Sequence, residues 1–464
     1  MHVLYFTGVE ILEQKSEAAN LLDVTRWKLT PYQVLSLSFA GLILAGAFLL
    51  MMPLASATGQ SLSFVDALFT STSAVCVTGL SIVDTGAYFS RFGQIVLILL
   101  IQAGGLGIMT MATLMALLMR KKIQLRERLV MQEALNQLTF AGIVRLTKYV
   151  IQVTLAIEFT GGTILAVRWY PEYGLEGIYF GYWHAISSFC NAGFDLFGGY
   201  QGLTGHVEDV TVNLSVSVMV ILGGIGFAVL ADLWENKKFA ACSLHTKVVL
   251  ATSGFLIAFG AIVVFLLEYD NPNTLGALSL KGKLLGSYFQ AVTPRSAGYH
   301  TLNIADLQRA TQFFLIILMF IGASPASTGG GVKTTTFAVL SAAIWALIRG
   351  KNDAELFQRR ISQNIIYKSF AVVFIAAALV IFVTMMLSVS EDLPFLAILF
   401  EVVSAFGTVG LSMGITASLS DWGKVLIAIT MFAGRVGPVT LALALALRTK
   451  KSPVQYPEGK ITIG

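Results

Sequence analysis

The chain has 464 residues, of which 56% are hydrophobic and 12% are charged, with a formal net charge of +5. A soluble domain carries roughly 25% charged residues, so this composition excludes a soluble globular protein and indicates an integral membrane protein. The net charge hides an uneven distribution along the chain and is no sign of affinity for nucleic acid.

Eight apolar stretches approach the ~20 residues that a helix needs to cross a bilayer. In chain order they cover residues 33–52, 92–118, 147–167, 210–231, 247–267, 311–347 with an interruption after 321, 365–387 and 424–447. Most of the 31 Lys and Arg residues fall in segments that these spans place on one side, whereas acidic residues gather on the other. The positive-inside rule therefore predicts that both termini are cytoplasmic.

A short apolar segment lies between the two spans of each pair, at residues 64–78, 180–192, 284–297 and 394–409. Each segment is too short to cross a bilayer and ends in a loop of small residues that contains a glycine. The four glycines, spaced by 114, 105 and 112 residues, are Gly79, Gly193, Gly298 and Gly410. An interfacial helix is the alternative for each segment, but it does not explain a glycine at the same place in all four.

This spacing predicts an all-α integral membrane fold of four tandem helix–pore loop–helix repeats around a pseudo-fourfold, channel-like pore. The repeats would cover residues 31–120, 121–235, 236–350 and 351–448, between an N-terminal extension (1–30) and a C-terminal tail (449–464). Glycine allows the backbone to turn carbonyl groups toward a pore, where they can replace the hydration shell of an ion. Further glycines recur after each loop, and their role in helix packing supports the fourfold duplication: Gly104, Gly105, Gly223, Gly224, Gly322 and Gly434.

Seven motifs follow one another along the chain. They are CVTGLSIVDTG (76–86), IQAGGLG (101–107), SSFCNAGF (187–194), LGGIGF (222–227), VTPRSAGY (292–299), SAFGTVGLSMG (404–414) and FAGRVGP (432–438). In this order they resemble the Trk/Ktr/HKT superfamily of potassium transporters, and most closely its KtrB-type bacterial subunits. The resemblance covers nearly the whole chain from about Thr30, and it implies potassium uptake with no cofactor other than the bound potassium ion.

The resemblance also implies a potassium filter bounded by the four glycines and lined by the carbonyl groups of their neighbours. The expected filter residues are Val77, Thr78, Gly79, Asn191, Ala192, Gly193, Ser296, Ala297, Gly298, Thr408, Val409 and Gly410. A glycine at position 79 is similar to the potassium-selective members, whereas plant members with serine there are associated with sodium. Because backbone oxygens would bind the ion, the loops are free to differ in sequence, and we expect some passage of sodium.

The sixth apolar stretch is interrupted by GASPASTGGGVKTTT (322–336), whose proline and glycines are poor helix formers. The Walker pattern is not met, because Val332 separates Gly331 from Lys333, so we expect no nucleotide site here. A broken helix inside the bilayer lines a water-filled path, and the resemblance implies a gate beneath the filter. The expected gate residues are Gly322, Ala323, Ser324, Pro325, Ala326, Ser327, Thr328, Gly329, Gly330, Gly331, Lys333 and Arg435.

Three basic residues lie near these expected sites. Arg295 precedes Gly298 by three positions, and we expect it to point away from the pore toward a carboxylate or a helix end; tuning of the ion is the alternative. Arg435 falls inside the last span, where a charge is costly and usually functional. We expect it to form a positive barrier or to hold the gate closed through hydrogen bonds, with a structural pairing to Glu158 or a carbonyl as the alternative. We expect Lys333 to reach the cytoplasmic edge.

The resemblance implies partners as well. KtrB-type subunits form homodimers in the bacterial plasma membrane on a cytosolic octameric ring of nucleotide-binding regulators of the KtrA type. We expect the same partners here, together with the lipid bilayer and without nucleic acid. Whether uptake depends on sodium is left open by the residues.

Two other classes of function fit the residues less well. A coupled transporter with inverted repeats usually has paired carboxylates near the midplane, and Glu158 is the one acidic residue that we expect deep in a span. A membrane enzyme would need converging His, Asp, Glu or Cys side chains. The five histidines are scattered instead, so we expect no enzyme activity and no catalytic residues: His2, His184, His206, His245 and His300.

Overall fold

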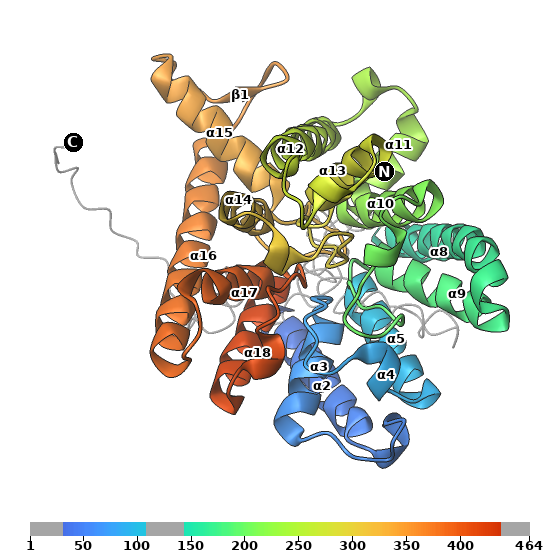
Figure 1. Cartoon of the computed structure of the whole chain (residues 1–464). Helices are drawn as coiled ribbons and strands as arrows, with labels where there is room; N and C mark the ends of the chain where they lie inside the picture. The colour runs from blue at the N-terminus through green and yellow to red at the C-terminus, as the bar shows by residue number, and fades with distance from the viewer. Residues whose placement is uncertain (1–30, 108–142, 438–464) are drawn as a thin grey trace, which may run out of the picture.

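A computed structural model describes residues 31–107 and 143–437, which form helices arranged around a common centre (Figure 1). Strands in this part of the chain are limited to one antiparallel hairpin of β1 (Glu355–Leu356) and β2 (Arg359–Arg360). The all-α architecture predicted from the sequence is confirmed. Short helical turns connect the longer helices: η1 (Pro53–Ala55), α4 (Thr85–Tyr88), η2 (Thr204–His206), η3 (Phe239–Ala241), η4 (Leu275–Ala277), η5 (Ile304–Asp306) and η6 (Thr416–Ser418).

The first helix of each predicted repeat is long and apolar. These outer helices are α2 (Pro31–Leu50), α8 (Ile143–Tyr173), α12 (Leu244–Glu268) and α16 (Gln363–Ser390). Each has the length and hydropathy to cross a membrane. Large apolar side chains such as Phe374 and Val389 on α16 are exposed, as expected for a helix face that contacts lipid.

The second, inner helix of each repeat is shorter. α5 (Arg91–Leu106) and α18 (Asp421–Val436) fall within the spans predicted over 92–118 and 424–447, whose later residues lie outside the described part of the chain. In the third repeat, α14 (Arg309–Phe320) ends where the sequence predicts an interruption.

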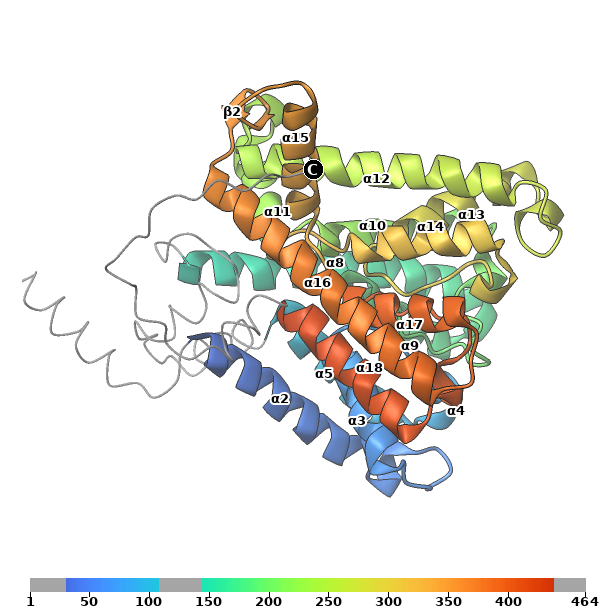
Figure 2. The ribbon, with the colours of Figure 1, turned by 90° about the vertical axis from the view of Figure 1, so that its left-hand side faces the viewer.

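Two inner helices are broken. α10 (Val210–Gly224) bends by 97° into α11 (Phe227–Asn236), so the span predicted over 210–231 is not one straight helix. Gly226 lies at this bend with a φ of +98°, which glycine adopts without strain because it has no Cβ atom. After the break that follows α14, α15 (Thr334–Ile348) turns sharply away from it (Figure 2).

Each predicted re-entrant segment begins as a short pore helix. The pore helices are α3 (Phe64–Val75), α9 (Leu175–Phe189), α13 (Leu280–Val292) and α17 (Phe395–Gly407). They are 12 to 15 residues long, which is shorter than a membrane span. Ser63 and Ser279 cap the N-termini of α3 and α13, because each side chain accepts a hydrogen bond from a backbone N–H three residues later.

The repeats pack in a cycle (Figure 1). Within each repeat the outer helix packs on its own pore helix, and between repeats the inner helix packs on the pore helix of the next repeat. The contacts between repeats are α5 with α9, α10 with α13, α14 with α17 and α18 with α3. Since the last contact joins the fourth repeat to the first, four similar units surround one axis.

Inner-helix glycines allow this close packing. A Cβ atom at Gly104, Gly223 or Gly434 would collide with a backbone carbonyl at the C-terminal end of the pore helix in the same repeat. Gly322 of the third repeat faces the carbonyl of Gly330 instead. Small residues permit such helix contacts, and here the neighbouring atom is backbone that cannot rotate away.

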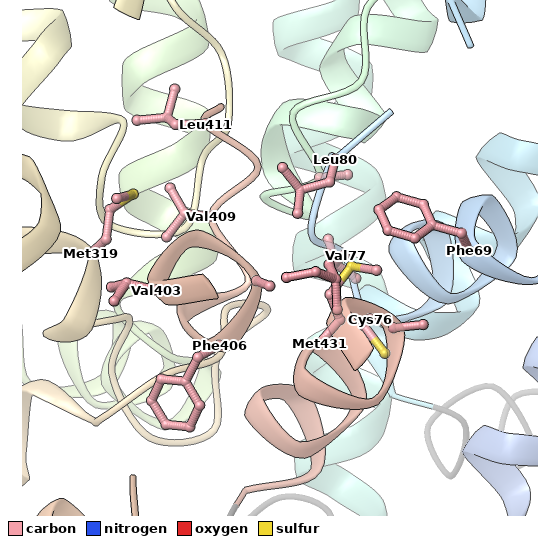
Figure 3. Packing of buried hydrophobic residues seen from close by; sticks show 14 of the residues in the cluster. Phe69, Cys76, Val77, Leu80, Met319, Val403, Phe406, Val409, Leu411 and Met431 are labelled. Atoms are coloured by element: carbon pink, nitrogen blue, oxygen red, sulfur yellow. The ribbon is translucent and has the colours of Figure 1, made fainter. Parts of the chain in front are cut away.

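Buried hydrophobic side chains fill the space around the pore helices and their loops (Figure 3). Val77 and Leu80 extend from the chain after α3, and Met431 of α18 lies beside Val77. Val409, after α17, and Met319 of α14 are likewise fully buried. This packing holds the backbone of the loops from behind.

Candidate functional site

Four backbone loops follow the pore helices: residues 77–79 (loop 1), 191–193 (loop 2), 296–298 (loop 3) and 408–410 (loop 4). All residues predicted for the filter lie in these loops. The glycine that ends each loop has a φ between +71° and +93°. The residue two positions earlier also has a positive φ, between +48° and +67° in Val77, Asn191, Ser296 and Thr408. Positive φ is uncommon outside glycine, so its recurrence at equivalent positions shows that the loops share one backbone conformation.

The loops touch one another in cyclic order. A Cβ atom added to any of the four glycines would lie within 2.8 Å of the carbonyl oxygen that precedes the glycine of the next loop. The pairs are Gly79 with Ala192, Gly193 with Ala297, Gly298 with Val409 and Gly410 with Thr78. Both the dihedral angles and the available space therefore require glycine at these positions.

The N–H groups of the loops are turned back toward the pore helices. Ser73 Oγ accepts from the Gly79 N–H at 3.0 Å, and Ser404 Oγ accepts from the Gly410 N–H at 3.1 Å. The carbonyl groups of the same serines accept the N–H of the residue before each glycine, at 2.7 and 2.8 Å. In loop 2 the Ser187 carbonyl accepts the corresponding N–H at 2.8 Å. Because these N–H groups point toward the pore helices, the carbonyl oxygens of the loops point in other directions.

Four of these oxygens lie against the glycine of a neighbouring loop. No described residue donates a hydrogen bond to the carbonyl groups of Thr78, Ala192, Ala297 or Val409. The pore helices end at the same place, so the partial negative charges of four helix C-termini converge there. Backbone oxygens in such a setting attract a cation and can replace part of its hydration shell. In the same described residues no cluster of His, Cys, Asp and Glu side chains is placed to hold a metal ion.

Residues 322–331, called the 322–331 segment below, lie against three of the four loops. The Gly330 N–H donates to Thr408 Oγ1 at 2.9 Å and to Ser296 Oγ at 3.3 Å. Thr328 Oγ1 donates to Asn191 Oδ1 at 3.1 Å. The residues predicted for the gate therefore meet those predicted for the filter.

The 322–331 segment also docks on the bend of the second inner helix. The N–H groups of Ser324 and Thr328 donate to the carbonyls of Gly224 and Gly223 at 2.9 and 3.2 Å. The Ala326 carbonyl accepts the N–H that begins α11, at 2.9 Å. Carbonyl groups at a helix C-terminus need outside partners, and the segment supplies them.

Arg435 joins this segment to two repeats. Its guanidinium donates to the Thr328 carbonyl and to the carbonyls of Gly104 and Gly105, the latter at 3.1 Å. A positive charge is favourable at the C-terminal end of α5, where the last carbonyls lack helical partners. An ion pair with Glu158 is not formed, because Glu158 accepts from a glutamine amide of α5 at 3.2 Å.

Two other predictions for basic side chains need correction. The prediction that Lys333 reaches the cytoplasmic edge is wrong, because its Nζ donates to the Gly329 carbonyl at 2.7 Å. Arg295 points away from the loops as predicted, but toward neither a carboxylate nor a helix end. Its guanidinium donates to the carbonyl and the hydroxyl of Ser253 at 3.2 and 3.1 Å, in the middle of α12. The outer helix α12 packs directly on α13, so its oxygens are the nearest partners.

Glu158 is not the only acidic side chain deep in the fold. Glu401 of α17 is fully buried and accepts from Ser412 at 2.7 Å and from Thr416 at 2.5 Å. Glu268, at the end of α12, is also fully buried. Glu401 ties its pore helix to the chain that leaves loop 4, and the sequence signal for it is a single acid in an otherwise apolar helix.

A ring of backbone loops, enclosed by membrane-type helices, defines a channel-like transport protein. The chain belongs to the TrkH family of cation transport proteins, whose pattern matches residues 18–453. The crystal structure of the potassium transporter TrkH from Vibrio parahaemolyticus has the same fold. It gives a TM-score of 0.73 at 16% identity and covers 91% of this chain and 86% of that one.

Several relatives are similar over almost their whole length. Ktr system potassium uptake protein B from Bacillus subtilis is 46% identical and covers 95% of this chain and 98% of its own. The protein of the same name from Vibrio alginolyticus is 38% identical over 93% and 94%. Potassium/sodium uptake protein NtpJ from Enterococcus hirae is 38% identical over 95% and 98%. These relatives are ion transporters and not enzymes.

Proposed function

We propose that this chain takes up potassium through the central ring of loops. The observation that carries the proposal is the cyclic contact of four loops, each with a glycine against the carbonyl of the next. Neutral oxygens and converging helix C-termini select a cation over an anion. The names of the relatives from Bacillus subtilis and Vibrio alginolyticus support potassium as the ion.

The filter in this proposal consists of residues 77–79, 191–193, 296–298 and 408–410. Backbone oxygens coordinate a dehydrated potassium ion, and side chains set only the shape of the loops. Each loop contributes a short run of carbonyls, so some sodium passes. The Enterococcus hirae relative, which carries both ions in its name, supports a test for sodium dependence.

The 322–331 segment acts as the gate in this proposal. Its hydrogen bonds with loops 2, 3 and 4, and the one that Arg435 donates to the Thr328 carbonyl, support this role. Opening requires these hydrogen bonds to break together. Lys333 stabilises the segment internally through Gly329.

The protein acts in the bacterial plasma membrane with both termini in the cytoplasm, as a homodimer bound to a cytosolic octameric ring of KtrA-type nucleotide-binding regulators. The words "Ktr system" in the names of two relatives support a multi-component assembly. The basic residues on the predicted cytoplasmic side support the orientation. The chain's tail over 449–464, where we expect part of the regulator contact, lies outside the described residues.

The filter is tested by a serine at position 410. We expect Gly410→Ser, measured by potassium and sodium flux into liposomes containing the purified chain, to reduce potassium-over-sodium discrimination roughly tenfold, the equivalent of ~1.4 kcal/mol. The reason is that a Cβ atom there would strike the Thr78 carbonyl.

The matched control is Gly414→Ser. Gly414 has a φ of +89°, close to the +93° of Gly410, but an added Cβ atom would meet nothing within 4 Å. Equal discrimination in both variants would refute the filter assignment. Flux compared with and without a sodium gradient, and with and without the regulator, tests sodium dependence and control.

A further inference from the structure

The residue two positions before each filter glycine differs in chemistry among the repeats. Asn191, Ser296 and Thr408 are polar in loops 2, 3 and 4, whereas loop 1 has Val77. All four have positive φ values and are fully buried. The three polar side chains contact the 322–331 segment, and Val77 packs in the hydrophobic core. This position is therefore polar in the three loops that contact the segment and apolar in the loop that does not.

Loops 3 and 4 share one hydrogen-bonded junction with the segment. The Gly330 N–H is shared between Thr408 Oγ1 at 2.9 Å and Ser296 Oγ at 3.3 Å. Ser296 Oγ in turn lies 2.8 Å from the carbonyl oxygen of Gly407 and 3.1 Å from that of Thr408. A shift of the segment removes the N–H on which both hydroxyl groups converge.

The backbone at these positions is held in a conformation that needs support. Thr408 is β-branched and has a φ of +48°, which is an outlier for such a residue. Strained dihedral angles of this kind cost ~1–3 kcal/mol and persist only where the surroundings impose them. Part of those surroundings is the 322–331 segment, so the loop conformation and the segment position stabilise each other.

We propose that Asn191, Ser296 and Thr408 are positioning residues that couple the filter to the 322–331 segment, so that displacement of the segment loosens loops 2, 3 and 4 and lowers potassium selectivity. This inference rests on the proposed function. Coupling between two sites is reciprocal. A potassium ion that favours the ordered loops therefore also favours the docked position of the segment.

The test is a double-mutant cycle read out as the potassium-over-sodium permeability ratio of the full chain in liposomes. Thr408→Val keeps the shape of the side chain and removes the hydroxyl. We expect it to lower the ratio by roughly two- to tenfold, as one neutral hydrogen bond would predict. In a chain shortened within 324–331 the same substitution has no further effect, because the partner is gone. Thr408→Ser, which keeps the hydroxyl, restores most of the ratio.

Thr430→Val is the matched control. Its hydroxyl is buried in α18 and donates only within that helix, to the Leu426 carbonyl at 2.8 Å. We expect no change in the permeability ratio. If Thr408→Val fails to yield folded protein, Ser296→Ala carries the same cycle.

Two results would overturn the coupling. One is an unchanged ratio in Thr408→Val, and the other is an equal loss of selectivity with and without the intact segment, which would assign Thr408 to the filter alone. Failure of the proposed function is a different result, namely no potassium-selective flux through the unmodified chain with its regulator present.

Discussion

The inner half of the third repeat differs from that of the other three. In repeats 1, 2 and 4 a glycine of the inner helix lies against the end of its own pore helix. In repeat 3 the inner helix stops at Phe320, and Gly322 lies against Gly330 of the 322–331 segment. Close glycine contacts thus hold the pore helices in three repeats, whereas the inner helix of the third repeat ends early and is followed by a segment that contacts the ring of loops.

The comparison also separates two kinds of contact. Repeats 1, 2 and 4 are held by backbone packing with no room for a side chain, which tolerates almost no displacement. The 322–331 segment is held by hydrogen bonds to Ser296, Thr408, Asn191 and Arg435, which can break and form again. Equivalent positions of one repeated unit therefore supply close backbone packing in repeats 1, 2 and 4 and the hydrogen-bonded segment that we propose as the gate in repeat 3.

The largest effect is expected when a side chain is added at one of the glycines that lie against a pore helix in repeats 1, 2 and 4. Gly434→Val places a Cβ atom against the Phe406 carbonyl, and we expect destabilisation of ~1–3 kcal/mol or more, since backbone cannot move aside. The yield of monodisperse protein and the Tm measure it. Gly254→Val is the control, because an added Cβ atom there would meet nothing within 4 Å. Equal stability of the two variants would contradict the rigid role of this contact.

Loss of Arg435 should weaken the attachment of the 322–331 segment. Arg435→Ala removes hydrogen bonds from a charged donor to the Thr328 carbonyl and to the end of α5, each worth ~1.5–3 kcal/mol. We expect basal potassium flux to rise roughly ten- to hundredfold, and shortening within 324–331 to do the same. The control is Arg309→Ala, at the exposed start of α14. Wild-type flux and regulation in both gate variants would place the gate elsewhere.

Gly322→Ala tests whether Gly322 behaves like the close-packed glycines of the other repeats or like the hydrogen-bonded segment. The added methyl group would collide with the Gly330 carbonyl, so the 322–331 segment must shift while the helices keep their packing. We expect this to destabilise the docked position of the segment by ~1 kcal/mol, which would raise basal flux roughly fivefold with little change in Tm. A fall in Tm like that of Gly434→Val, with no rise in flux, would show that Gly322 behaves like the close-packed glycines.

The smallest effect is expected at Ser404. Ser404→Ala removes the hydroxyl that accepts the Gly410 N–H at 3.1 Å and should lower stability by ~1 kcal/mol, with a slight loss of selectivity. Ser388→Ala is the control, because that hydroxyl donates only to the Thr384 carbonyl within α16. If thermal unfolding cannot distinguish the two variants, the serine does not anchor loop 4.

Much of the architecture could be predicted because it depends on short-range features. A pore helix needs an apolar run too short to span a bilayer, and the predicted segments contain or overlap α3, α9, α13 and α17. The glycine that ends each of the four loops has a positive φ, which restricts the residue type at that position regardless of what lies around it. The interruption after Ile321 was visible for the same reason, since proline and glycine act on the helix that contains them.

The partners of polar side chains could not be predicted in this way. Arg435 bonds Thr328 and Gly104, far from it along the chain, and Lys333 turns back on Gly329 instead of reaching the edge. The 322–331 segment docks at the sharp bend between α10 and α11. The sequence of residues 210–231 does not predict this contact. Backbone conformation is set by the chemistry of a few adjacent residues, whereas a hydrogen bond between distant residues exists only after four repeats have packed around one axis.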